Sequence, residues 1–326
     1  MSLPYSLRLL CLSLASFFLA HAALALASWL AAPAAIRLAE MMRPRRAAWF
    51  LFHLRVLPAL LAAIVVLALG VPSYLWLEPR ATDETVGLAC CAAAFLGAAI
   101  WCISIARVLH ATLRSSRYAR QCRRIGREIS REGAAVPTSV LDVETPVLAL
   151  AGVFRPRVLV SRSVLSVLSP GQLDAALRHE NAHRVSRDNL KRFVWLLTPE
   201  IFPLTHSSAA LERAWACFSE WAADDEATNG DTRLSLLLAA ALVRVARMGA
   251  APQPSISLAS LIAGDHDLST RVDRLLRAKT AVPASFWLWC TLLSGVAVVV
   301  TVVLAGAMQW PAILRAAHEI LERLAA

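Results

Sequence analysis

Four long apolar stretches constrain the fold of this chain more than any other feature. They cover residues 9–35, 49–77, 86–109 and 284–308. A helix of about 20 apolar residues crosses the hydrocarbon core of a bilayer, and it satisfies its own backbone hydrogen bonds there. Because 58% of the 326 residues are hydrophobic, we predict a mainly α-helical membrane protein with four transmembrane helices. Pro58 lies inside the second stretch and can kink it.

The distribution of arginines orients these helices. Arg8 alone precedes the first stretch, whereas several arginines follow it, at positions 37, 43, 45 and 46. A cleaved signal peptide has the opposite polarity, so we expect the first stretch to remain as a membrane helix. A second run of arginines follows the third stretch, while the 78–85 connection is short and acidic. Since positive residues stay in the cytoplasm, we expect a multi-pass protein of a bacterial-type cell membrane with both termini outside.

The chain divides at these stretches. Residues 1–110 would hold three membrane helices, and residues 309–326 a short external tail. The 111–283 segment is long enough for one cytoplasmic domain with its own core. The third helix is expected to continue to about residue 132, where turn residues end it. Beyond that point, apolar runs between turn and cap residues predict an α+β domain, with strands at 140–143, 147–150 and 158–161 and helices at 170–192, 209–228, 234–248 and 271–277.

The most specific motif lies in this domain. Residues 179–183 read His-Glu-Asn-Ala-His, which is HExxH, on a stretch whose start at Ser169 has the residues of a capping box. His179 and His183 lie on one face of a helix, where they can hold one zinc ion. Glu180, about 100° around the helix, can take a proton from a water at that ion and pass it to a leaving amine. A solvated helix rich in arginine is the alternative.

A second motif downstream favours the zinc site. Glu220 lies in the 209–228 helical pattern, and Asp224 follows it one turn later on the same face. A catalytic zinc ion takes three protein ligands and keeps one position open. We therefore predict His179, His183 and Glu220 as the ligands of one zinc ion, although Glu220 could also be an ordinary surface acid.

Two further acids are candidates for orienting the ligand histidines. A carboxylate that accepts the free ring N–H of such a histidine fixes its tautomer and orientation. Asp224 is the first candidate, and Asp188, five residues after His183, is the second. His206 and His266 could supply an additional hydrogen bond during a reaction, but each could equally be a surface histidine.

The remaining composition excludes several other classes. The chain has no phosphate-binding glycine loop, no serine-centred nucleophile motif, and seven cysteines without a CxxC pair. Its net charge of +10 follows from the membrane topology and from attraction to anionic lipid. We therefore expect the lipid bilayer and a protein or peptide substrate as partners, and no direct binding of nucleic acid.

Several segments resemble the BlaR/MecR-type antirepressor metallopeptidases. They are Arg-Pro-Arg-Val-Leu-Val at 155–160, Leu-Ser-Pro-Gly-Gln-Leu-Asp at 168–174, the HExxH segment at 177–189, Leu-Glu-Arg at 211–213 and Glu-Trp-Ala-Ala-Asp at 220–224. The order of three membrane helices, a zinc domain and a fourth membrane helix is also similar. The resemblance covers roughly residues 5–308; it is specific at the zinc motifs and generic in the membrane stretches.

The resemblance implies a zincin-like metallopeptidase that signals by proteolysis. Such a protein responds to an external cue and cuts itself, a cytoplasmic repressor of the BlaI/MecI type, or both. By position, His179, His183 and Glu220 would bind zinc and Glu180 would be the base. The chain departs from the β-lactam sensors of this family because no penicillin-binding domain follows residue 308, so its stimulus is open. Asn181 also replaces an apolar residue that is common at this position.

Two alternatives remain. A HtpX-like membrane protease that degrades damaged membrane proteins shares HExxH and a distal glutamate, but three membrane helices before the zinc domain favour the antirepressor type. A transmembrane scaffold that has lost catalysis is the alternative from another class, and the presence of Glu180 together with all three candidate ligands speaks against it.

Overall fold

The computed structural model describes residues 4–78, 86–125, 127–129, 138–202, 206–249, 259–260, 265–277 and 310–325. Its described part is mostly helical, with 81% of those residues in helices. Three helical stretches are long and apolar enough to cross a membrane: Tyr5–Glu40, Pro44–Leu77 and Leu88–Arg117. These stretches confirm three of the predicted membrane helices. The predicted fourth one, at 284–308, lies outside the described residues.

The membrane helices expose apolar side chains on most of their surface. Helix α1 covers Tyr5–Glu40, α2 covers Pro44–Val65, and α4 covers Leu88–Ile125. Only 22% of the most apolar window of each candidate span is buried, and side chains such as Leu67 and Phe95 are about 70% exposed. Water would disfavour such a surface, whereas lipid hydrocarbon suits it. The three helices therefore fit a helical membrane protein.

The second membrane helix contains an irregular turn near its end. Helix α2 includes Pro58, and a short π-helix, η1 (Val66–Gly70), then joins it to α3 (Val71–Leu77). Pro72 follows this π-helix and can donate no backbone hydrogen bond to the preceding turn. A π-turn before a proline relieves the clash of its ring with that turn. The helix continues through Pro58, and its irregular turn lies just before Pro72.

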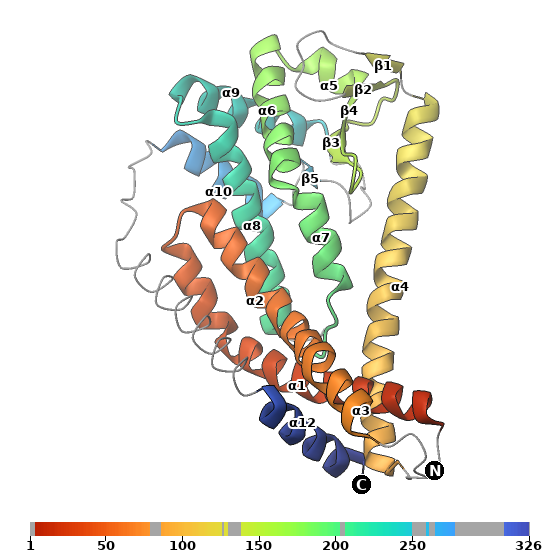
Figure 1. Ribbon diagram of the computed structural model, residues 1–326. Coiled ribbons are helices and arrows are strands. Elements are labelled where there is room, and N and C mark those ends of the chain that lie inside the picture. Colours follow the sequence, from red (N-terminus) through yellow and green to blue (C-terminus); the bar gives the residue numbers. More distant parts are fainter. Residues whose placement is uncertain are drawn as a thin grey trace.

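A five-stranded sheet lies beyond the end of α4 (Figure 1). The expected continuation of this helix to residue 132 is wrong, because α4 ends at Ile125 and a strand follows. That strand pairs with its neighbour, so the sheet supplies backbone partners that a helix would otherwise provide. The other three predicted strands are confirmed within about two residues. The sheet order is β1-β2-β4-β3-β5, with only β2 and β4 parallel, and the strands are β1 (Arg127–Ile129), β2 (Thr138–Leu141), β3 (Leu148–Ala151), β4 (Arg157–Ser161) and β5 (Ala259–Ser260).

Six helices follow the sheet or pack beside it. They are α5 (Arg162–Val167), α6 (Pro170–Ser186), α7 (Asp188–Leu197), α8 (His206–Thr228), α9 (Thr232–Arg247) and α10 (Asp265–Leu276). Helices α6, α9 and α10 form one apolar core with β3 and β4. Helices α7 and α8 instead pack on α1 and α2, where Trp195 stacks on Trp215 at 5.0 Å. Figure 1 shows α8 running between the two regions.

The end of the chain is helical. Residues Trp310–Ala325 form α12, which packs against α3 and the beginning of α1 at the end of the molecule opposite the sheet (Figure 1). The sequence predicts only a short tail here, so this packed helix is an addition to the expected architecture. Its apolar face includes Leu321, which is buried against the helices of the membrane region.

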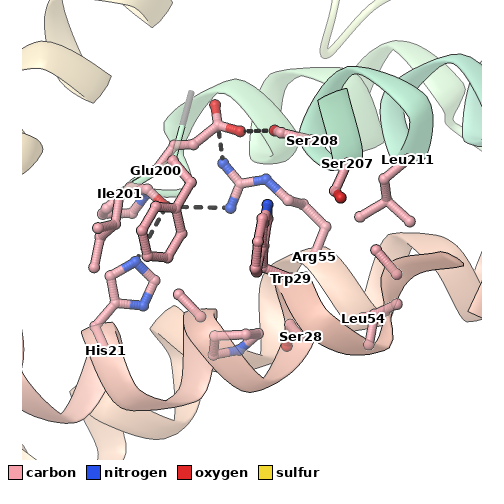
Figure 2. Close-up of a pocket in the computed structure, with 15 residues that line it drawn as sticks. His21, Ser28, Trp29, Leu54, Arg55, Glu200, Ile201, Ser207, Ser208 and Leu211 are labelled. Carbon is pink, nitrogen blue, oxygen red and sulfur yellow. Dashed lines mark hydrogen bonds and ion pairs between the residues drawn. The ribbon is translucent and has the colours of Figure 1, made fainter. Parts of the chain in front are cut away.

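Basic side chains from three membrane helices meet at the loop between α7 and α8, and Figure 2 shows two of them, His21 and Arg55. Arg55 of α2 donates to the carbonyls of Thr198 and Pro199 at 3.0 and 3.1 Å. The Nε2 atom of His21, which is buried, lies 3.2 Å from the carbonyl oxygen of Pro199. Glu200 pairs with Arg55 at 3.6 Å and with Arg107 of α4 at 3.3 Å. The membrane helices therefore hold the loop that joins the two helices behind the candidate site.

Replacing Arg55 by methionine is expected to destabilise the folded protein by about 3 kcal/mol, because it leaves Glu200 with one partner fewer and removes a charged donor from two buried carbonyls. The thermal unfolding midpoint of the full-length protein in detergent measures the loss. Arg162→Met is the matched control, since Arg162 pairs with Asp142 at an exposed position and should change stability by less than about 1 kcal/mol. Equal losses in the two variants would contradict a role for the buried cluster.

Candidate metal centre

The helix that carries HExxH begins as the sequence predicts but ends earlier. Ser169 and Gln172 form the capping box at the start of α6. The expected continuation to residue 192 is wrong, because Arg187 adopts a left-handed conformation with φ of 56° and separates α6 from α7. This one residue turns the chain so that Asp188 lies against His183, with 2.7 Å between Oδ2 and Nδ1. An exposed arginine in this conformation is unusual, and its effect is to build the site.

Three candidate ligands converge at the crossing of α6 and α8. The Nε2 atoms of His179 and His183 lie 3.1 Å apart, and they lie 3.4 and 3.5 Å from the carboxylate oxygens of Glu220. Both histidines are buried, and the Glu220 side chain is 13% exposed. Ligand atoms about 2.1 Å from a tetrahedral zinc ion are about 3.4 Å apart. The observed separations therefore match three corners of a zinc tetrahedron.

The two outer acids lie against the opposite ring nitrogens. Asp224 Oδ1 is 2.9 Å from Nδ1 of His179, and Asp188 approaches Nδ1 of His183 as described above. A carboxylate at Nδ1 favours the tautomer that has its proton there, which leaves a lone pair on Nε2. Both predicted acids thus lie where they can direct the Nε2 atoms toward a common point.

Glu180 lies beside this centre in an unusual environment. Its side chain is fully buried, and neither of its carboxylate oxygens has a hydrogen-bond partner among the residues that the structure describes. Burial raises the pKa of the Glu180 carboxyl to about 7. Buried polar groups without partners are rare because they cost free energy, and they concentrate at functional sites. The position and proton affinity of Glu180 suit a group that accepts and returns a proton.

Two cations in the site escape prediction from the sequence. Arg271 of α10 is buried and donates to both oxygens of Asp224, at 3.0 and 2.7 Å, while its Nη1 atom lies 2.9 Å from Glu220. Lys191 of α7 pairs with Asp188 at 2.8 Å. In the sequence, Arg271 belongs to an amphipathic stretch with arginines three positions apart, and this pattern is typical of a solvated face. Only its contact with α8 distinguishes Arg271 from an arginine on a solvated face.

The neighbouring charges shift the ionisation of the candidate ligands. Burial alone would lower the pKa of His183, but Glu220 and Asp188 raise it well above its ordinary value. Burial would raise the pKa of Glu220, but Arg271 and His183 hold it well below its ordinary range. The pKa of Asp224 is lowered to about 2, because Arg271 outweighs the effect of burial. Glu220 and Asp224 are therefore ionised at neutral pH, and in the metal-free protein a histidine binds a proton.

The donor set fits a divalent cation. Two cations, Arg271 and Lys191, face four carboxylates in the site, namely those of Glu180, Asp188, Glu220 and Asp224. With neutral histidines, between one and two negative charges remain at neutral pH, because a carboxyl with a pKa of about 7 at Glu180 is only partly ionised, and a divalent cation would offset them. Two Nε2 lone pairs at 3.1 Å also repel each other unless a proton or a cation lies between them. Nitrogen and carboxylate donors in this number are those of a catalytic zinc site.

A second group of possible ligands lies at the other end of the molecule. Glu78 follows α3, and His318 and Glu322 belong to α12. Arg8 already pairs with Glu78 at 3.1 Å, and Glu322 is more than half exposed. This group therefore has its own cation and lacks the enclosed geometry of the first.

The affinity for zinc is expected to rise with pH through the neutral range. The raised pKa of His183 means that the metal-free site holds a proton at neutral pH, and zinc must displace it. Below this pKa the proton competes with zinc, and above it the competition ends. Calorimetric titration with zinc at about pH 6 and pH 8, in buffers of different ionisation enthalpy, measures both the affinity and the released protons. A pH-independent affinity, or the same result for Glu220→Gln, would contradict this assignment of the site; Glu322→Gln is the control that should change nothing.

Comparison with protein-family models finds no match for this chain, and comparison with curated protein sequences finds none. The functional argument therefore rests on the geometry of the centre and on the motifs of the sequence. Of the other candidate residues, His206 is exposed at the start of α8, far from the ligands, and the side chain of His266 lies outside the described residues.

Proposed function

We propose that this protein is an integral membrane zinc endopeptidase with His179, His183 and Glu220 as ligands and Glu180 as general base. One observation carries the proposal: three ligand atoms of the right types lie within 4.8 Å of one another, directly beside a buried carboxylate without hydrogen bonds. The three ligand atoms can bind a metal ion, and the buried carboxylate can transfer a proton next to it. Peptide hydrolysis by a zinc enzyme needs both.

The residues of the chain have separate tasks in this reaction. A zinc ion bound here supplies Lewis acidity, which polarises a peptide carbonyl and makes water more acidic. Glu180 accepts the proton of the attacking water and returns it to the leaving amine, for which a pKa near neutrality is favourable. Asp188 and Asp224 keep the histidine rings oriented. Arg271 fixes the carboxylate of Glu220.

We propose further that this peptidase acts in signalling from the cytoplasmic face of the cell membrane. Its substrate would be a repressor of the BlaI/MecI type, the protein itself, or both. The motifs shared with the BlaR/MecR-type antirepressors support this role, as do three candidate membrane spans before the centre. Loss of catalysis in a scaffold is less favoured, because a buried carboxylate without partners costs free energy and a scaffold gains nothing from it.

A census of new protein N-termini tests the proposal. Cells that produce the unaltered protein are compared with cells that produce Glu180→Gln at the same level. Discrete ends that vanish in the variant identify a protease and its substrates. A transcriptional repressor among them supports signalling, while many fragments of membrane proteins would indicate HtpX-like quality control. Identical profiles across a panel of envelope stresses, from a protein that contains zinc, would contradict the protease proposal.

A further inference from the structure

A groove opens beside the metal centre and reaches one of its ligands. It is enclosed by the β3–β4 hairpin, the end of α6 and the start of α7, with a volume of about 630 Å³. His183 forms part of its lining. Asn189 ties the two walls together, since its side-chain amide donates to the carbonyls of Leu150 and Gly152 at 3.1 and 2.8 Å. A segment of chain that occupies this groove therefore lies next to the candidate zinc ligands.

The groove is strongly basic. Four arginines line it, from both walls: Arg155, Arg157, Arg184 and Arg187. No acidic residue is among the described residues that line it. Asp188, which follows Arg187 in the chain, is buried and already pairs with His183 and Lys191. Arg155 and Arg187 are both exposed, one on each wall, so the groove presents positive charge to solvent from both sides.

Tight local geometry constrains the backbone of the hairpin that carries Arg155 and Arg157. Gly152 has φ of +102°, and a Cβ atom there would lie 3.1 Å from the carbonyl oxygen of Arg155. Only glycine adopts this turn without strain. At the tip, Phe154 is 77% exposed and contacts Phe193 of α7 edge to face at 5.9 Å. The basic walls therefore alternate with apolar side chains, including Leu190.

We propose that this groove binds an acidic segment of the substrate, in which carboxylates flank an apolar residue near the bond to be cut. This inference rests on the proposed function, because it assigns the substrate class of the same centre. Complementary charge favours the acidic residues, and Phe154 and Leu190 receive the apolar one. The groove volume exceeds what one phosphate headgroup fills and suits several side chains, which favours a peptide over a lipid surface.

Binding of a matched pair of peptides tests the inference without catalysis. A short fluorescein-labelled peptide with a central Leu-Phe pair and glutamates on both sides is compared with its twin in which glutamine replaces every glutamate. Fluorescence anisotropy measures their Kd for full-length Glu180→Gln in neutral detergent, with and without zinc. We expect the glutamate peptide to bind about tenfold more tightly, and this preference to shrink as salt is added. Equal Kd values would overturn the proposal.

Two double variants in the same background locate the effect. Arg155→Glu with Arg187→Glu should abolish the preference for the acidic peptide. Arg162→Glu with Arg178→Glu changes the net charge equally at exposed positions outside the groove and should retain it. Loss of the preference in both double variants would overturn the proposal, because the attraction would then come from the whole molecule and not from the groove.

The protein with intact Glu180 separates this inference from the proposed function. Preferential binding without cleavage of either peptide would contradict the protease and leave the acidic groove supported. Equal cleavage of both peptides would support the protease and overturn the groove. The last experiment measures binding of the protein to vesicles of phosphatidylglycerol. If vesicle binding depends on Arg155 and Arg187 and the protein shows no preference between the two peptides, the peptide proposal is overturned in favour of the membrane surface.

Discussion

Replacing Glu180 by glutamine is expected to leave the zinc content of the protein unchanged and to slow peptide cleavage by about 10² to 10⁴-fold, the usual contribution of a general base. Glutamine has the same shape and cannot accept the proton. Glu180 makes no hydrogen bond in the described structure, so the substitution breaks none. It also removes a buried charge, so the thermal unfolding midpoint should stay the same or rise. Metal analysis, turnover and unfolding of one purified sample measure all three effects.

Glu220→Gln is the matched comparison for this result. It makes a change of the same size at a residue that we assign to the metal, so it should lose zinc as well as activity. Normal turnover by Glu180→Gln would remove the base assignment. Loss of zinc in Glu180→Gln would instead place this carboxylate among the ligands.

The principal residues of the site could be predicted because their geometry is local. Four positions along a helix bring His179 and His183 onto one face, and the same spacing relates Glu220 to Asp224. Neither pattern depends on the rest of the fold. The three ligand atoms meet because the two helices cross, and this crossing is a feature of the tertiary structure. The sequence supplies only the residue types that become ligands there.

Other features depend on contacts that leave no local signal. Arg271 binds Asp224 across 47 positions of the chain, and its neighbour Arg274 has the same residue type with a partly exposed side chain. The helix break at Arg187 could not be predicted, because the residue in the left-handed conformation is an arginine and not the usual glycine or asparagine. Asp188 lies five positions after His183. In a continuous helix this spacing would place Asp188 away from the face that carries the ligands, and the break at Arg187 brings it back to His183.

The same distinction applies to the fold. Three membrane helices could be predicted because length and apolar composition suffice for a span. The strand after α4 could not, since its pairing with β2 decides the conformation of residues 127–129, and local propensity gives way to such tertiary contacts. The buried arginines of the membrane region are similar, because Arg55 lies in an apolar run and its partners belong to a distant loop.

Replacing Arg271 by methionine is expected to destabilise the metal-free protein by about 3–5 kcal/mol, because two buried carboxylates, Glu220 and Asp224, lose their cation. Zinc should restore a large part of this loss, since it brings positive charge to the same carboxylate. The stabilisation that zinc confers should therefore be greater in the variant than in the unaltered protein. Thermal unfolding midpoints of the full-length protein in detergent, with zinc and with a chelator, measure the difference.

Arg274→Met provides the control for this prediction from the same helix. Arg274 pairs with Asp225 at 2.6 Å, but both side chains are partly exposed, so the loss should be about 1 kcal/mol or less and independent of zinc. Equal destabilisation of Arg271→Met with and without zinc would mean that Arg271 acts only as a structural partner of α8. A loss that zinc reverses would mean that the arginine and the metal ion stabilise the same carboxylate, as expected if Arg271 belongs to the metal centre.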